Sequence, residues 1–437
     1  MRGVPQQLLG NAHRSVRRSA RFQDVGIYAL LDTTRSAEMH RVNLVELPLQ
    51  ITTMKDSEER STRGVALSTL FPVEPPPPAR KPDPLVDFVR GLGLWIIYVD
   101  HIYPNVCSNL TLQAFGFSDF AEIFVFVSAY LGAAMYQRAL AAGGFPAAIA
   151  KLRLRVARLY VAHILTMSAL LLLLWLFDTR GTSLNNQSMY AWVPHPAEYG
   201  VRILTLMYAP PVAALLPLYI LAAPLILGAV WGLSRAPRSV VAFSALVWLA
   251  GQFRALDLPV MTRDEAWFFR PLAWQFLFVI GVASRLYSDQ WLRFALQRWV
   301  IRLELCVVAV AFLLKMAARV PAAVPALVHL GTFARVLGRE AGKAHLSPFR
   351  LMHFLCLLGL FVVFSARHRQ WLSSWPARVA IAYGQNSLLI YCLGVLLATA
   401  ANLVLVADGG APMQVAITVL GLVLQCAIAW PLRARTR

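Results

Sequence analysis

Long apolar runs constrain this chain more than any other feature of its sequence. From about residue 85 onward they recur with short polar connections between them, and a helix needs roughly 20 apolar residues to cross a bilayer. A helix also satisfies its own backbone polar groups, as the bilayer interior requires. Composition agrees, because 58% of the residues are hydrophobic and only 14% are charged, against about 25% charged in soluble domains. We predict an all-α, polytopic integral membrane protein.

The candidate spans number about ten when roughly 20 residues are taken as the guide. They are 88–107, 119–137, 156–177, 212–232, 238–253, 271–286, 300–318, 350–366, 380–406 and 412–432. Lys and Arg gather in alternate connections, including 138–158, 285–302 and 367–378. Since cytoplasmic loops carry this excess, the pattern places both termini in the cytoplasm. The net charge of +19 therefore fits a protein whose partner is a lipid bilayer. It does not indicate binding to nucleic acid.

Residues 1–84 differ from the rest of the chain. They are polar, mixed in charge and end in the proline run 75–78, and none of their runs could span a bilayer. Such composition favours a disordered extension, which the orientation makes cytosolic. No apolar core of a signal peptide is visible, and a start of the native protein at Met54 is a further hypothesis. The membrane-embedded domain is then 85–437.

Ionisable residues inside the first span point to function, because burying them in a bilayer is costly. Arg90 and His101 are eleven residues apart, which places them within roughly 20° on a helix and about 16 Å apart along its axis. Asp87 shares that face, whereas Asp100 points about 100° away. One stripe therefore joins an arginine at the inner end to a histidine in the outer half.

The second span supplies a partner for this histidine. Glu122 lies near the outer end of the span, at the depth of His101, and a short connection makes the two helices neighbours. A carboxylate beside an imidazole fixes its tautomer and raises its basicity. We therefore expect Glu122 to orient His101 as a general base.

Further polar residues divide into two zones. The outer zone adds Gln275, Arg350 and His353, and the inner zone joins Asn386 and Ser387 to Arg90 and the basic connection after the second span. Aromatic residues at the span ends are also typical of a membrane-interface belt. The five cysteines lie in apolar segments, and no histidine pairs with Cys or carboxylate at ligand spacing, so we expect no metal site.

Several ordered motifs resemble known proteins. Asp87-x-x-Arg90-Gly91 and the ten residues between Arg90 and His101 resemble the Arg-x10-His signature of the type 3 membrane acyltransferase superfamily. Over about residues 80–432 the chain resembles the OpgC family more closely. The motifs that carry this are Asp100-His101-Ile102, the run Gly116–Ser128, Leu216-Pro-Leu-Tyr219, Trp274-Gln275 and Ser347–His353.

This resemblance implies a ten-helix protein of the bacterial inner membrane that succinylates osmoregulated periplasmic glucans. The implied donor is a cytosolic acyl-CoA, succinyl-CoA, and no cofactor is bound permanently. The expected catalytic residues are His101, Glu122 and Asp100. The expected substrate-binding residues are Arg90, Asp119, Tyr219, Trp274, Gln275, Arg350, His353, Asn386 and Ser387.

Alternatives remain open at this point. The acceptor could be another envelope polysaccharide or lipopolysaccharide, and transfer could be direct or pass through an acyl-histidine. A proton-coupled transporter with His101 and Glu122 as a relay is the rival from another class. Transporters often repeat their helix interruptions in both halves. Here Pro210, Pro211 and Pro217 lack a matching set, which disfavours that reading.

Overall fold

The computed structural model describes residues 83–177, 196–253, 268–319, 328–407 and 409–433. Throughout these residues the regular structure is helical, without a strand, so the all-α prediction is confirmed for them. They belong to one compact unit, Pro82–Arg437. The predicted N-terminal extension lies almost wholly outside the described residues.

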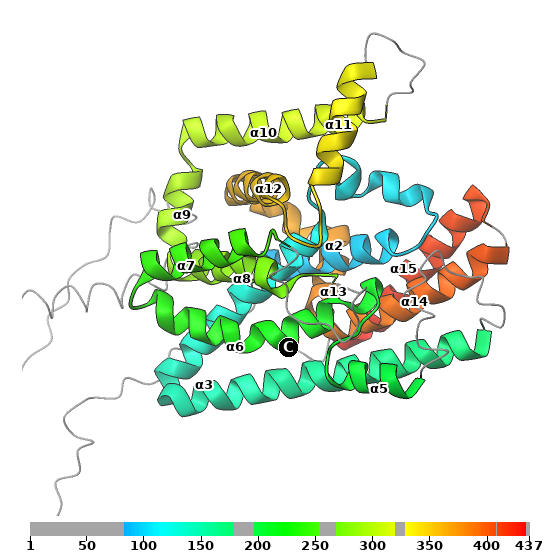
Figure 1. Ribbon diagram of the computed structural model, residues 1–437, viewed down its shortest axis with the longest axis horizontal. Coiled ribbons are helices and arrows are strands. Elements are labelled where there is room, and N and C mark those ends of the chain that lie inside the picture. The colour runs from blue at the N-terminus through cyan, green and yellow to red at the C-terminus, as the bar shows by residue number, and fades with distance from the viewer. Residues whose placement is uncertain (1–82, 178–195, 254–267, 320–327, 408, 434–437) are drawn as a thin grey trace, which may run out of the picture. The chain divides into compact units, whose positions relative to one another are not determined.

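Thirteen α-helices and four short 3₁₀ helices make up the described residues, and Figure 1 labels the α-helices. The α-helices are α2 (Pro84–Asp100), α3 (Phe120–Phe177), α5 (Pro196–Leu204), α6 (Leu215–Leu233), α7 (Pro237–Ala250), α8 (Pro271–Leu286), α9 (Ser288–Ala295), α10 (Arg298–Ala317), α11 (Val328–Glu340), α12 (Pro348–Arg367), α13 (Trp375–Gln385), α14 (Ser387–Ala407) and α15 (Ala411–Arg433). The 3₁₀ helices are η3 (Val106–Leu110), η4 (Leu112–Ala114), η5 (Pro211–Ala213) and η8 (Arg369–Ser373).

Proline and side-chain caps explain where several helices begin. Pro84, Pro237, Pro271 and Pro348 each stand in the first turn of a helix, where the missing N–H costs nothing and the fixed φ angle already suits the helix. Asp83 accepts a hydrogen bond from the Leu85 amide at the start of α2. Such a cap satisfies one of the free N–H groups of the first turn.

Five segments in the described part of the chain are long and apolar enough to cross a membrane. They lie within Phe120–Phe177, Pro211–Leu233, Pro348–Arg367, Ser387–Val406 and Ala411–Leu432. Large apolar side chains such as Leu165, Phe243 and Val423 are exposed on these or neighbouring helices, which suits contact with lipid. These features indicate a membrane protein, while the count of ten spans and the orientation remain predictions.

Two predicted spans lie in the two arms of one long helical segment, and a third predicted span is broken. The spans 119–137 and 156–177 lie in α3, whose two arms meet at the non-helical Gly143 and Gly144 (Figure 1). Gly144 has φ +62°, a conformation that glycine adopts without steric cost. The span 380–406 breaks at Asn386, which ends α13 and bonds through its side chain to the Ala382 carbonyl. Asn competes with helical backbone bonds in this way.

The first span is also shorter than predicted. Helix α2 ends at Asp100, with His101 as its C-terminal cap, and Pro104 follows, which has no N–H to donate to a further helical turn. Residues 101–107 therefore form a connection and not the last turns of a membrane helix. This change carries His101 from a helix interior to a helix end.

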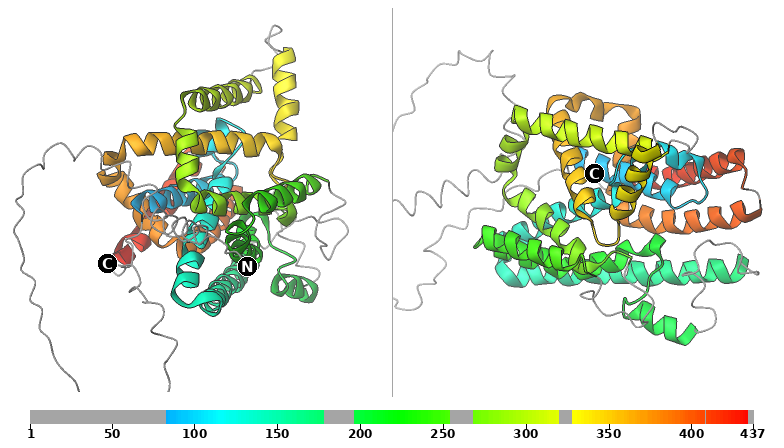
Figure 2. Two further views of the ribbon diagram at one scale, coloured as in Figure 1. Left: turned by 90° about the vertical axis from the view of Figure 1, so that its left-hand side faces the viewer. Right: turned by 45° about the horizontal axis from the view of Figure 1, so that its top comes forward.

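Helix α2 lies inside the bundle, against α13, α14 and α3. Figure 2 shows it in blue, enclosed by other helices. Its closest approach is to α13, because a Cβ on Gly91 would stand 1.7 Å from the Ala380 carbonyl oxygen and one on Gly384 would stand 1.8 Å from that of Asp87. Only glycine permits such backbone contact. The two glycines thus set the position of the helix that carries Arg90 and His101.

Candidate active site

His101 is held by backbone carbonyl groups. Its Nδ1 lies 2.5 Å from the Ile97 carbonyl oxygen, and the carbonyl of Pro211 also interacts with the ring. A neutral imidazole carries one N–H, so only one of these carbonyls can accept a proton at a time. The tautomer with its N–H on Nδ1 satisfies the 2.5 Å contact with Ile97 and carries its lone pair on Nε2. That is the atom a general base would use.

Asn402 of α14 positions the same residue and was missed by the sequence analysis. Its Nδ2 donates to the His101 carbonyl at 3.0 Å, and its Oδ1 accepts from the Tyr103 amide at 2.8 Å. The Asn402 side chain therefore fixes the backbone of His101 and of Tyr103 in the turn after α2. An amide inside the apolar run 388–406 was the available signal for it.

A mainly apolar cavity adjoins His101. It is small, with room for about one water molecule, and its lining residues come from α2 and its C-terminal cap, η5 and α14. They are Leu94, Ile97, Tyr98, His101, Val212, Ile390, Tyr391, Gly394 and Val395. The Tyr391 hydroxyl donates to the Val212 carbonyl at 3.0 Å. The imidazole of His101 therefore faces a small pocket with mainly apolar walls.

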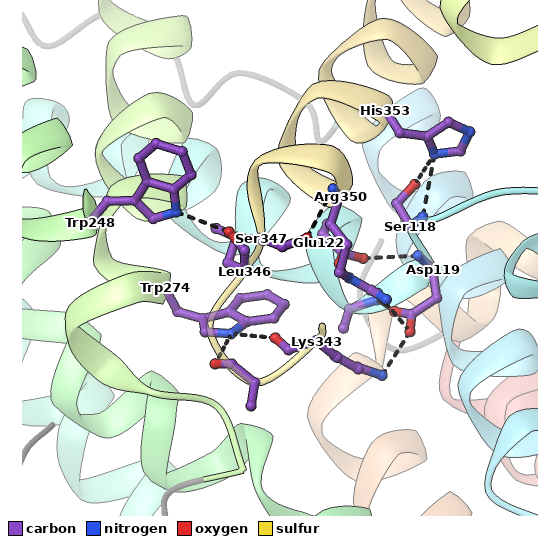
Figure 3. A network of polar contacts seen from close by, with 12 residues as sticks. Ser118, Asp119, Glu122, Trp248, Trp274, Lys343, Leu346, Ser347, Arg350 and His353 are labelled. Carbon is purple, nitrogen blue, oxygen red and sulfur yellow. Dashed lines mark hydrogen bonds and ion pairs between the residues drawn. The ribbon is translucent and has the colours of Figure 1, made fainter. Parts of the chain in front are cut away.

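Glu122 does not orient His101, contrary to our expectation. Its carboxylate is fully buried, and Oε1 accepts from Arg350 Nε at 2.7 Å while Oε2 accepts from the Asp119 amide at 3.0 Å. Figure 3 shows these contacts. A guanidinium donates charge-assisted hydrogen bonds to a carboxylate and balances its buried charge. Arg350, from the first turn of α12, therefore occupies the place that we assigned to the histidine.

Asp119 extends this ion-pair cluster to Lys343. Its Oδ2 lies 2.8 Å from Lys343 Nζ and 3.1 Å from Arg350 Nη2, as seen in Figure 3. The residue immediately precedes α3. Burial opposes its ionisation, but the charges of Lys343 and Arg350 outweigh burial and hold the pKa of its carboxyl well below the usual range. Asp119 is therefore a permanent anion that fixes the Lys343 ammonium.

His353 adds a further contact between α12 and the segment that leads into α3. Its Nδ1 accepts from the Ser118 amide at 3.3 Å and lies 2.7 Å from Ser118 Oγ, and both side chains are buried. Arg350 and His353 thus share one face of α12, as predicted from their spacing. That face holds the N-terminal end of α3.

Trp274 and Gln275 make contacts between structural elements. Trp274 is fully buried, and its Nε1 donates to the Lys343 and Ala344 carbonyls at 3.1 Å. Gln275 exchanges two hydrogen bonds with Ser244 of α7, at 2.6 and 2.7 Å. Both side chains are satisfied by protein groups, so they hold α7, α8 and the segment before α12 together. They leave few free polar atoms for a substrate.

Asp100 faces the connection after α2 and not His101. Its carboxylate interacts with the side chains of Thr111 and Gln113 and with the charge of Lys343. Its Oδ1 is buried and has no hydrogen-bond partner in the described residues. Lys343 and Asp119 also act electrostatically on His101.

Arg90 lies in the second turn of α2. Its Nη1 lies 3.3 Å from Asp87 Oδ1, and its Nη2 donates to the Ser387 hydroxyl at the start of α14. The neighbouring Asn386 bonds within its own chain turn instead. Of the two predicted inner residues on this segment, only Ser387 contacts Arg90.

A second arginine lies close to this inner group. Arg155 donates to Ser128 Oγ at 2.9 Å, and its charge acts on Arg90 and Tyr219. In the part of the chain that the structure describes, no carboxylate pairs with Arg155. The Tyr219 hydroxyl is buried and lacks a hydrogen-bond partner among the same residues. Two guanidinium groups near an unpaired hydroxyl form a site suited to an anion.

These features define a helical, membrane-type protein with a histidine beside a small apolar cavity and two neighbouring arginines elsewhere in the bundle. The chain belongs to the OpgC family, whose model, described as OpgC protein, matches residues 82–437. Membership in this family suggests an acyltransferase. Neither the curated proteins nor the solved structures contain a significant match to the chain. Among the described residues, no group of three or more His, Cys, Asp or Glu side chains could hold a metal ion.

Proposed function

We propose that this protein moves an acyl group, succinyl in the first instance, from a cytosolic acyl-CoA to a hydroxyl of a periplasmic glucan. The observation that carries the proposal is the stripe along α2 that runs from Arg90, near Arg155, to His101 at the wall of an apolar cavity. Family membership supports the reaction class. The bilayer is then the barrier across which the two substrates meet.

The donor enters at the inner group. Arg90, Arg155 and Tyr219 offer charge-assisted and neutral hydrogen bonds to the phosphates of CoA. Arg90 and His101 stand about 16 Å apart along α2, a span that the pantetheine arm of the donor can cover. The apolar cavity walls suit the methylene groups of that arm and keep water from the thioester.

The acceptor hydroxyl approaches from the outer side. His101 Nε2 takes its proton as the hydroxyl oxygen attacks the thioester carbonyl carbon. The new C–O bond forms, the C–S bond breaks, and the departing CoA thiolate receives the proton from the histidine. Asp100 and Lys343 are available on this side to bind neighbouring hydroxyls of a sugar.

Mass spectrometry of periplasmic glucans, with and without the gene, tests the proposal. We expect deletion to remove a succinyl-sized substituent, the intact gene to restore it, and His101→Ala to insert normally in the membrane without restoring it. Thr399→Val on α14 serves as a control, because the Thr399 hydroxyl bonds only within its own helix, to the Val395 carbonyl. Glucans that are unchanged by deletion would overturn the assignment of the acceptor and direct the search to lipopolysaccharide and other envelope polysaccharides.

A further inference from the structure

Gln425 of α15 is a buried amide without a partner. Its side chain is 0% exposed, and neither Oε1 nor Nε2 has a hydrogen-bond partner among the described residues. Leaving a buried amide unpaired costs free energy, so such groups are almost always paired with protein or with another molecule. The side chain therefore points to a ligand.

Another glutamine on the same helix shows the usual arrangement. Gln414 accepts a hydrogen bond from the Val106 amide at 2.8 Å and donates one to the Gly409 carbonyl at 2.7 Å. Its amide holds the end of α15 to the connection after α2. Gln414 therefore has a structural role that Gln425 lacks.

Gln425 lies next to Gly394, a residue that lines the cavity beside His101. The space that a Cβ on Gly394 would fill is bounded by Gln425 Oε1 at 3.7 Å and by the Tyr98 Cβ at 4.0 Å. Gly394 and Tyr98 both line the cavity. Gly394 therefore places no side chain of its own between the cavity and the unpaired amide.

Along the direction of α2, Gln425 lies between Arg90 and His101, which mark the two ends of the proposed donor site. Ser387 contacts Arg90 at the inner end, and Gly394 follows seven residues later, about 10 Å along α14. Since Arg90 and His101 are about 16 Å apart on α2, roughly 6 Å remain between this level and His101. A donor that reached from Arg90 to His101 would pass Gln425 a short distance before its thioester.

We propose that Gln425 binds the amide of the pantetheine arm that lies nearest to the thioester. A secondary amide offers one N–H and one C=O, which match the acceptor and donors of the glutamine side chain. Two methylene groups and the sulfur separate this amide from the acyl carbon, in keeping with the short remaining distance. The inference rests on the proposed function and adds a specificity-determining residue for the donor.

Three succinyl donors test this role with the full-length protein in detergent and with purified glucan as acceptor. Succinyl-CoA has the whole arm, succinyl-N-acetylcysteamine keeps only the nearest amide, and the succinyl thioester of ethanethiol has none. We expect Gln425→Met to lower kcat/KM by about 3- to 10-fold for the first two donors, the effect of one lost hydrogen bond. Its kcat/KM for the ethanethiol thioester is expected to match that of the wild type.

Thermal unfolding without donor separates a binding role from a structural one. Gln425→Met removes an unpaired buried amide, so we expect no fall in Tm. Gln414→Met is the matched control, because it loses a paired amide on the same helix. We expect it to lower Tm and to leave the relative use of the three donors unchanged.

Gly394→Ala provides a second route if Gln425→Met does not fold. The added methyl group would lie in ordinary contact with Gln425 Oε1, at 3.7 Å, and would screen the amide from the cavity. We expect the same selective loss for amide-bearing donors. An equal loss for all three donors in both variants would overturn the role of Gln425. A wild-type protein that transfers succinyl from none of them would instead overturn the proposed function.

Discussion

A backbone carbonyl and not a carboxylate sets the state of His101. The contact with the Ile97 carbonyl keeps the N–H on Nδ1, and Asn402 holds the carbonyl group of the same residue. A base is effective only when its lone pair points at the reacting hydroxyl. The position of this histidine therefore depends on a residue about 300 positions away in the chain.

Asn402→Leu tests that dependence. Removing both hydrogen bonds frees the turn after α2, and a small displacement of His101 should lower kcat by about 10- to 100-fold. We expect KM for acyl-CoA to stay unchanged, because the inner arginines are intact. Steady-state kinetics with Thr399→Val as the control would show this. A rise in KM at constant kcat would contradict a positioning role.

Glu122 has a different role from the one its depth in the membrane predicted. Because its carboxylate bonds to Arg350 and not to His101, Glu122→Gln should destabilise the protein without moving the pH at which the catalytic base titrates. The pH profile of kcat/KM for the surviving activity measures this. A profile displaced by a full unit would show that Glu122 acts on His101 after all.

At the scale of helices, a buried ion-pair cluster braces α3 against α12. Asp119 and Glu122 at the start of α3 meet Arg350 of α12 and Lys343 from the preceding segment. Trp274 ties that segment to α8. The brace keeps the outer polar residues beside the end of α2, so it belongs to the support of the site.

Arg350→Met should weaken this brace severely. Removing one partner of a buried ion pair leaves uncompensated charge and costs about 3–5 kcal/mol. Unfolding of the purified protein in detergent would report the loss. Arg138→Met is a suitable control, because Arg138 is exposed and bonds only to the Ala134 carbonyl of its own helix. Equal stability of the two variants would rule out a bracing role for Arg350.

At the scale of the whole molecule, the proposed reaction needs Arg90 and His101 to lie toward opposite sides of the membrane. The inner arginines belong to the side that the distribution of Lys and Arg makes cytoplasmic. The connection between α2 and α3, with η3 and η4, then faces the periplasm. This assignment follows from loop charge and has a direct test.

Single cysteines introduced after replacement of the five native ones would report the orientation. Asn109 in η3 and Arg138 in α3 are both exposed. We expect a membrane-impermeant maleimide to label Asn109→Cys in spheroplasts and to label Arg138→Cys only after permeabilisation. The opposite pattern would reverse the membrane orientation and with it the direction of acyl transfer.

The sequence by itself determined the helical class, the apolar helices and the stripe that joins Arg90 to His101. These depend on local hydrophobicity and on the helical period, which short segments express without help from the rest of the chain. It also placed Arg350 and His353 on one face of α12.

Only the tertiary structure decided which polar groups meet. Glu122 and Arg350 are 228 positions apart, and neither spacing nor depth in the membrane distinguishes an arginine of α12 from a nearby histidine as the partner of a carboxylate. The break at Asn386, the role of Asn402 and the unpaired amide of Gln425 likewise arise where separate helices come into contact. A buried polar group takes the partner that packing brings within hydrogen-bond distance, and that choice is made by the assembled bundle.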